Sequence, residues 1–196
     1  MKMERTISST GHWALAVAAL VISASAVALP PNAAMLAKAC AGCHGTNGAS
    51  AGPAMPSLAG QSKEAIVAAM KNFKSGERPS SIMSRLAKAY TDADFAAMGE
   101  FFAGQKLHLT QQALDPNRVA RGASLQASKC AGCHTENGKV NNDDAPAMAS
   151  QWLPYLQMQM ALYVEGKRKT SGMTEVIKTL SADDLESLLH FYASVK

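Results

Sequence analysis

The stretch CAGCHGTNG, residues 40–48, returns almost unchanged as CAGCHTENG at residues 130–138. Each copy places two cysteines and a histidine in the order C-x-x-C-H, and the copies lie 90 residues apart (130 − 40). The chain of 196 residues contains four cysteines, and all four belong to these two strings. Two copies of one string of reactive side chains indicate two copies of one structural unit.

The repeat extends well beyond the cysteines. Shifting the sequence by 90 residues aligns the two halves without a gap, and it pairs Gly48 with Gly138, Pro56 with Pro146, Gln61 with Gln151, Met70 with Met160, Gly76 with Gly166, Arg78 with Arg168, Met83 with Met173 and Phe101 with Phe191. The segment 104–116, GQKLHLTQQALDP, has no counterpart. We therefore predict a first domain at 29–103, a linker at 104–116 and a second domain at 117–196.

The pattern of apolar residues predicts an all-α fold. A helix is expected from about Ser62 to Lys74, where Ile66, Met70 and Phe73 share one face. The last helix of each half should begin at a hydroxyl cap, Thr91 or Ser181, with an aspartate three residues later. No strand-like alternation of apolar and polar residues occurs in the sequence.

The first 28 residues are typical of a cleaved secretory signal peptide. Lys2 and Arg5 precede an apolar run at 13–22 and then small residues that suit a signal peptidase. The alternative is a membrane anchor, but a run of about ten residues is short of the roughly 20 needed to span a bilayer. We therefore expect a periplasmic protein whose mature chain has no membrane span.

Charge does not favour nucleic acid as a partner. The formal charge of the chain is +4, and cleavage after residue 28 removes Lys2, Arg5 and Glu4, which leaves +3 (4 − 2 + 1). The only dense basic run is GKRK at 166–169, and a short run of this kind is usually a solvated loop.

C-x-x-C-H is the attachment string of c-type haem, whose vinyl groups form thioethers with both thiols while the histidine binds the iron. A thioredoxin-like pair would need a βαβ setting, and a zinc site would need further ligands near each string. Two strings in equivalent places in an exported helical chain favour two covalently bound haems. The predicted thioether residues are Cys40, Cys43, Cys130 and Cys133, and the predicted iron ligands are His44 and His134.

Methionine is the expected sixth ligand of each iron. Of the 11 methionines, only two pairs recur in both halves, Met70 with Met160 and Met83 with Met173. The first pair lies on the packing face of a predicted helix, where methionine usually fills the core. The second pair lies in a predicted extended loop after Gly76 or Gly166, the glycine expected to end the preceding helix. We therefore assign Met83 and Met173 as axial ligands.

Six-coordinate irons are closed to substrate, so the chain is expected to carry single electrons and to have no catalytic site of its own. His108 and His190 have no counterpart in the other half, which argues against a second histidine ligand. Each haem adds two propionates, so the charge of the loaded protein would fall from about +3 to about −1. A catalytic dihaem enzyme such as a peroxidase would need an iron with a vacant or displaceable ligand position. Methionine ligation of both irons would argue against that class.

The segments FKSGER, SSIMSRLAKAYTDADF, QWLPYLQMQM and LLHFYASVK, together with the CAGCHGTNG string, resemble the dihaem cytochrome subunit of flavocytochrome c sulfide dehydrogenase. The resemblance covers essentially the whole mature chain. It implies two tandem class I cytochrome c-like domains and a flavoprotein (FAD) partner that oxidises sulfide and passes electrons to the haems. It also implies the same haem residues, Cys40, Cys43, His44 and Met83, then Cys130, Cys133, His134 and Met173.

The alternative is a free dihaem cytochrome c that shuttles electrons to a terminal oxidase. The expected partners are the flavoprotein, as a heterodimer, and a soluble electron acceptor. A permanent subunit interface is usually larger and more apolar than a transient one. Trp152 and Tyr155 could supply such a surface, or they could pack against the second haem.

Overall fold

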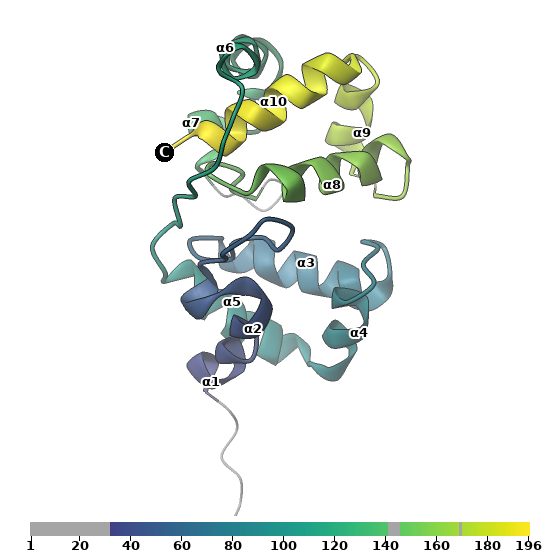
Figure 1. Ribbon diagram of the computed structural model, residues 1–196. Helices are drawn as coiled ribbons and strands as arrows, with labels where there is room; N and C mark the ends of the chain where they lie inside the picture. Colours follow the sequence, from purple (N-terminus) through teal and green to yellow (C-terminus); the bar gives the residue numbers. More distant parts are fainter. Residues whose placement is uncertain (1–31, 141–145, 169) are drawn as a thin grey trace, which may run out of the picture. The chain divides into compact units, whose positions relative to one another are not determined.

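Helices make up the regular secondary structure of residues 32–140, 146–168 and 170–196, which the computed structural model describes (Figure 1). No strand occurs within these ranges, so the all-α prediction is confirmed for them. The predicted signal peptide lies outside the described residues. Within those residues, no helix is both long and apolar enough to cross a membrane.

The helices form two groups in the order of the repeats. The first group contains α1 (Ala33–Lys38), α2 (Ala41–His44), the 3₁₀ turn η1 (Thr46–Gly48), α3 (Lys63–Ser75), α4 (Met83–Leu86), the 3₁₀ turn η2 (Ala87–Ala89) and α5 (Asp92–Ala103). The second contains α6 (Pro116–Leu125), the π-helix η3 (Gln126–Cys130), α7 (Thr135–Gly138), α8 (Leu153–Val164), α9 (Ser171–Ile177) and α10 (Ala182–Ser194).

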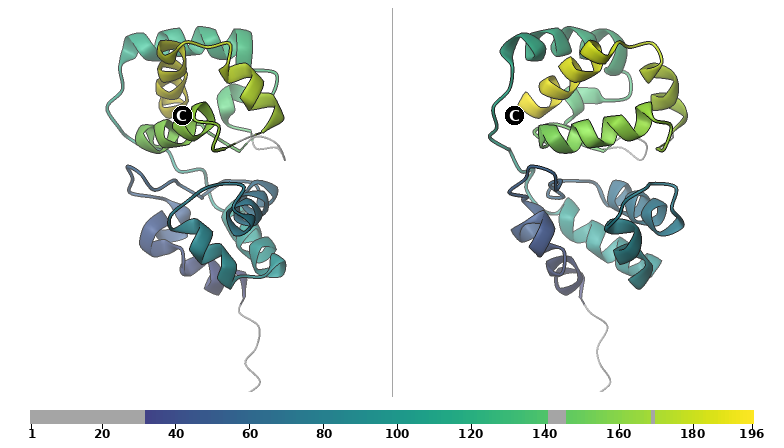
Figure 2. Two further views of the ribbon diagram at one scale, coloured as in Figure 1. Left: turned by 90° about the vertical axis from the view of Figure 1, so that its right-hand side faces the viewer. Right: turned by 45° about the vertical axis from the view of Figure 1, so that its right-hand side comes forward.

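An extended segment connects α5 to α6 (Figure 2). Helix α6 starts at Pro116, the last residue of the predicted linker, because the Asp115 side chain accepts hydrogen bonds from the first backbone N–H groups and proline is tolerated in the first turn. The domain limits at 29–103 and 117–196 stay predictions.

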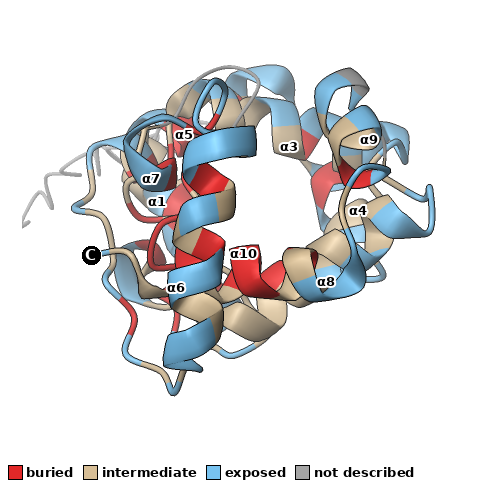
Figure 3. Ribbon diagram, turned by 90° about the horizontal axis from the view of Figure 1, so that it is seen from above, coloured by how far each residue is buried: buried red, intermediate tan, exposed pale blue. Residues whose placement is uncertain are grey.

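Each repeat buries its own hydrophobic core. In the first, α1 and α3 pack against α5, and Phe95, Met98 and Phe102 are almost fully buried. In the second, α6 and α8 pack against α10, whose buried residues are drawn red in Figure 3. Helices α6 and α10 cross so closely that a Cβ atom at Gly122 would lie 2.1 Å from the Ser187 backbone oxygen, so this crossing requires glycine.

The predicted helix ends are largely confirmed. Helix α3 covers Lys63–Ser75, with the Ser62 hydroxyl accepting from the Ala65 N–H and Gly76 ending the helix in the left-handed conformation. Capping boxes begin α5 at Thr91 and α10 at Ser181. Around the first cysteine motif the chain breaks after α1, and Ala41–His44 form the separate short helix α2.

The predicted extended loop around Met83 and Met173 was wrong. Met83 begins α4, and Met173 lies inside α9. The Met83 backbone N–H donates to the Ser80 hydroxyl at 3.0 Å, just before this turn. The residues that follow Met83, Ser-Arg-Leu-Ala-Lys-Ala, are mostly good helix formers, and Ala87 is fully buried in the first core. The residues before Met83 favour a loop, whereas those after it favour a helix.

Two glutamines join the repeats by equivalent hydrogen bonds within the single compact unit 31–196. The Gln151 side chain accepts from the Ser57 N–H at 2.9 Å and donates to the Ser57 carbonyl at 3.0 Å. The Gln61 side chain accepts from the Ala147 N–H at 3.2 Å and donates to the Ala147 carbonyl at 2.8 Å. Since Ser57 and Ala147 also differ by 90 positions, each repeat makes the same contact to the other.

Trp152 also lies between the repeats. Its Nε1–H donates to the Ser50 carbonyl at 3.1 Å, and its indole ring lies over Gly52, where a Cβ atom would approach it to 2.4 Å. Tyr155 accepts a hydrogen bond from Arg78 at 2.8 Å. Both aromatic residues therefore contact the other repeat, an arrangement that neither sequence-based interpretation anticipated.

We expect Gln151→Leu to lower the free energy of unfolding of the haem-loaded protein by about 2–6 kcal/mol. The change leaves the buried Ser57 N–H and carbonyl without their partner, at roughly 1–3 kcal/mol for each group. Guanidinium titration followed by circular dichroism measures the effect. Gln111→Leu, at an exposed glutamine, is the matched control. Equal midpoints for the two variants would show that the glutamine contact does not stabilise the fold.

Candidate functional site

The first C-x-x-C-H string surrounds a buried histidine. Cys40 precedes α2, and Cys43 and His44 lie within it. The His44 ring is buried, and its Nδ1 lies 2.8 Å from the Pro56 carbonyl oxygen. A carbonyl only accepts hydrogen bonds, so Nδ1 carries the proton and Nε2 keeps the lone pair that a metal requires.

The second string has different supports. Gln126, at the start of η3, donates from Nε2 to the His134 carbonyl at 2.7 Å and accepts a hydrogen bond from the Tyr192 hydroxyl. The Tyr192 and His134 rings meet edge to face with their centroids 6.0 Å apart. The Nδ1 atom of His134 is buried and has no hydrogen-bond partner in the part of the chain that the structure describes.

Burial shifts the pKa of both histidines and of one thiol in each string toward the neutral form. It lowers the pKa of His44, against the opposing effect of the Pro56 hydrogen bond, and it lowers the pKa of His134. Burial also raises the pKa of the Cys40 and Cys130 thiols. Neutral imidazole is the form that binds a metal. A thiol with raised pKa is unlike the activated thiolate of a thioredoxin-type pair, so that alternative loses support.

The two strings fit covalent haem better than a zinc site. In each, one thiol is half-buried, the second is exposed, and the histidine beside them is buried. Within the described ranges, no three His, Cys, Asp or Glu side chains gather in a way that could hold a metal ion. A single histidine ligand held next to two thiols matches attachment to a porphyrin, which would supply four nitrogen ligands to the iron itself.

The recurring methionines occupy two different settings. Met70 is buried in the first core, and Met160 packs against the second core. Met83 is half-buried at the start of α4, where it packs against the first core together with Cys40. Met173 is half-buried in α9. The first pair fills the cores, and the second pair remains the better candidate for iron.

His108 and His190, the other two histidines in the described part of the chain, lie outside the cysteine strings. His190 Nδ1 accepts from the Asp115 N–H at 3.1 Å, and its Nε2 lies 3.4 Å from a Glu186 carboxylate oxygen. This histidine therefore takes part in the contacts between α6 and α10. His108 lies half-buried in the extended segment between α5 and α6.

Three residues that support the histidines were missed by sequence reasoning. Pro56 recurs as Pro146 in the repeat alignment, but the alignment cannot show that its carbonyl faces a histidine. Gln126 and Tyr192 have the apolar counterparts Leu36 and Phe102 in the first repeat. The signal available in the sequence was that Gln126 and Tyr192 are polar where the first repeat has apolar residues.

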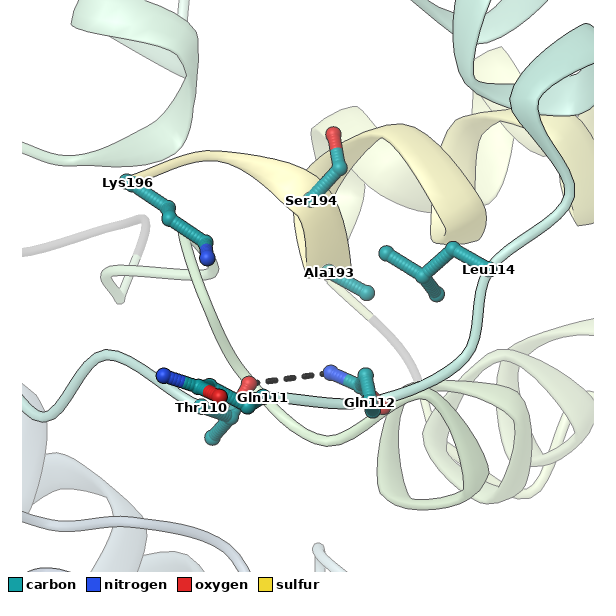
Figure 4. Close-up of a pocket in the computed structure, with 7 residues that line it drawn as sticks. All are labelled: Thr110, Gln111, Gln112, Leu114, Ala193, Ser194 and Lys196. Atoms are coloured by element: carbon teal, nitrogen blue, oxygen red, sulfur yellow. Dashed lines mark hydrogen bonds between the residues drawn. The ribbon is translucent and has the colours of Figure 1, made fainter.

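A pocket of about 350 Å³ lies apart from both strings, between the connecting segment and the end of α10 (Figure 4). Its lining residues are Thr110, Gln111, Gln112, Leu114, Ala193, Ser194 and Lys196. Gln112 Nε2 donates to the Thr110 hydroxyl at 2.9 Å across one side of it. None of these residues is a predicted haem residue.

Comparison with known proteins also finds a repeated unit in this chain. The cytochrome c family profile matches twice, at residues 32–115 and 119–194. Cytochrome c4 from Pseudomonas aeruginosa is 32% identical over 155 residues, which cover 74% of this chain and 76% of that protein. The crystal structure of reduced cytochrome c4 from Pseudomonas stutzeri, 26% identical, superposes with a TM-score of 0.74 over 85% of this chain and 100% of that one.

The names of two further relatives refer to dehydrogenases of thiosulfate or sulfide. A thiosulfate dehydrogenase electron acceptor of Stutzerimonas stutzeri is 28% identical, over 94% of this chain and 95% of that protein. A cytochrome subunit of sulfide dehydrogenase from Chlorobaculum tepidum is 44% identical over 68 residues, which are 35% of this chain and 61% of that protein. This chain therefore belongs to the cytochrome c family, as an electron-transfer protein of the two-domain, dihaem c4 type with two covalently bound haems.

Proposed function

We propose that this chain works in the periplasm as the electron-accepting partner of a flavoprotein (FAD) sulfide dehydrogenase, with which it forms a heterodimer. The chain itself is not the catalyst. It takes up electrons singly and passes them to a soluble acceptor. The observation that carries the electron-transfer role is the pair of buried histidines, each beside two cysteines, in two equivalent repeats.

We assign the haem residues as the sequence predicted them. The thioethers form at Cys40, Cys43, Cys130 and Cys133, and the axial ligands are His44 and Met83 in the first repeat and His134 and Met173 in the second. A bound c-type haem supplies a one-electron Fe(III)/Fe(II) couple. The chain holds the imidazoles in position, the first through the Pro56 carbonyl and the second through contact with Tyr192.

Two observations support a sulfur-compound dehydrogenase as the electron donor. The segment shared with the Chlorobaculum sulfide dehydrogenase subunit reaches 44% identity, although it covers only 35% of this chain. The protein named as a thiosulfate dehydrogenase acceptor matches along 94% of it. Sulfide is the favoured substrate of the partner because that match has the higher identity.

The second candidate is a free dihaem carrier that delivers electrons to a terminal oxidase. It is favoured by the match to cytochrome c4 over 74% of the chain. The position of Trp152 favours it as well, because this residue contacts Ser50 and Gly52 of the other repeat. A permanent flavoprotein interface would therefore have to use other apolar residues.

Replacing Met83 by alanine is expected to remove about half of the sulfur-to-iron charge-transfer absorbance of the oxidised protein, because one of two methionine ligands is lost. The equilibrium constant for reduction of that haem should fall at least tenfold, because methionine ligation raises the reduction potential. A tenfold change corresponds to about 59 mV for a one-electron couple. Met35→Ala, at an exposed methionine of α1, should change neither quantity. A Met83→Ala protein with the full band would exclude Met83 as a ligand.

The partner can be identified on protein purified gently from the cells that make it. We expect two c-type haems and one flavin on a single particle that contains a second polypeptide, and we expect sulfide to reduce the haems of that particle. The isolated chain should not be reduced by sulfide at a comparable rate. A lone chain of mature size with two haems and no flavin would favour the free carrier.

A further inference from the structure

The chain follows different paths after the histidines of the two cysteine strings. His44 is the last residue of α2, and Gly45 then takes φ 74° and ψ 165°, a conformation that glycine adopts at little cost. A Cβ atom at Gly45 would also lie 1.9 Å from the Ala49 backbone oxygen. The equivalent residue of the second repeat is Thr135, whose β-branched side chain excludes that conformation.

The second repeat places its positive φ angles one residue later. Thr135 does not have a positive φ, whereas Glu136 has φ 47° and ψ 43° and Asn137 has φ 58° and ψ 32°. Asparagine tolerates the left-handed region, and Asn47 uses it in the first repeat, but glutamate rarely adopts it. The segment directly after His134 is therefore strained in a way that the first repeat avoids.

This path directs the His134 carbonyl toward the buried Gln126 side chain. His134 has φ −100° and ψ 69°, which lies outside the helical range, whereas His44 belongs to α2. The ψ angle sets the direction of a residue's carbonyl, so the two histidine carbonyls leave their strings in different directions. A carbonyl that faces buried surroundings needs a hydrogen-bond donor, and Gln126 Nε2 donates to it at 2.7 Å.

Three residues of this arrangement differ together between the repeats. The second repeat has Thr135, Gln126 and Tyr192 where the first has Gly45, Leu36 and Phe102. Gln126 and Tyr192 are almost fully buried, and the Tyr192 hydroxyl donates to Gln126 Oε1. A buried amide needs partners for its oxygen as well as for its nitrogen, so the tyrosine hydroxyl completes what the glutamine begins.

We propose that Gln126 and Tyr192 are positioning residues for the second iron ligand, and that they are required because the chain has Thr135 there. They hold His134 by its main chain, whereas His44 is held by its ring. In the described ranges, the ring Nδ1 of His134 has no acceptor of its own. Partners of this kind orient a ligand and tune the metal. The proposal rests on the assignment of His134 as an iron ligand and does not depend on the electron donor.

The first test follows the haem methyl resonances of the purified, oxidised dihaem protein, because their spread reports the orientation of the axial histidine ring. Gln126→Leu and Tyr192→Phe should each shift the resonances of the second haem and leave those of the first haem in place. Tyr192→Phe is expected to fold, since Phe102 occupies the equivalent position. The control Gln111→Leu, at an exposed residue, should shift neither set.

The wild-type spectrum separates this proposal from the ligand assignment beneath it. Ring protons of His134 that are not shifted by iron would overturn both. Iron-shifted His134 protons, together with second-haem resonances that stay in place in Gln126→Leu and Tyr192→Phe, would overturn the proposal alone. Equal shifts at both haems would overturn it as well, because the effect would then not be local to His134.

The second test measures whether the residue differences are coupled, by guanidinium titration of the dihaem protein. In the wild-type background, Thr135→Gly should lower the unfolding midpoint, because glycine loosens a path that Gln126 already supports. In the Gln126→Leu background, the same change should raise the midpoint, because it permits the path of the first repeat. Opposite signs in two backgrounds demonstrate coupling between the sites. Changes of the same sign and size would overturn the dependence on Thr135.

Discussion

The structure depends on one constraint, which is that each repeat must bury a neutral imidazole directly beside two thiols. Burial alone gives neutrality, but it does not decide which ring nitrogen keeps its proton. In the first repeat, the Pro56 carbonyl makes that choice by accepting from Nδ1 of His44. Proline at this position has no N–H of its own, so its carbonyl is the only backbone group that it offers to a neighbour.

The second repeat meets the same constraint with different residues. Gln126 and Tyr192 replace two apolar side chains, and the chain passes from α6 into a π-helix that ends at Cys130, the first residue of the second cysteine string. Burial raises the pKa of Tyr192, so its hydroxyl remains a donor to Gln126. The two repeats therefore share a fold and a ligand order, but their histidines have different surroundings. Two haems in such settings need not have equal potentials, since hydrogen bonding to the ligand is one of the means by which a protein tunes iron.

Much of this arrangement could be predicted from the sequence, because it is encoded locally. The caps at Thr91 and Ser181, the helix 63–75 and the cysteine strings each involve residues only a few positions apart. The contacts between the repeats could not be predicted in this way. Gln61 and Gln151 were recognised as an equivalent pair, yet the sequence does not state that each binds the backbone of the opposite repeat, 86 and 94 positions away. The short helix at Met83 was missed for a different reason, since only the residues that follow it favour a helix.

The interface between the repeats also changes how the function is understood. Trp152 and Tyr155 are the kind of residues that anchor a partner protein, but here they contact Ser50 and Arg78 of the same chain. The two cores are small, and small domains gain much of their stability from what they are joined to. These two aromatic side chains are therefore used within the chain, and a donor protein has to bind through other residues.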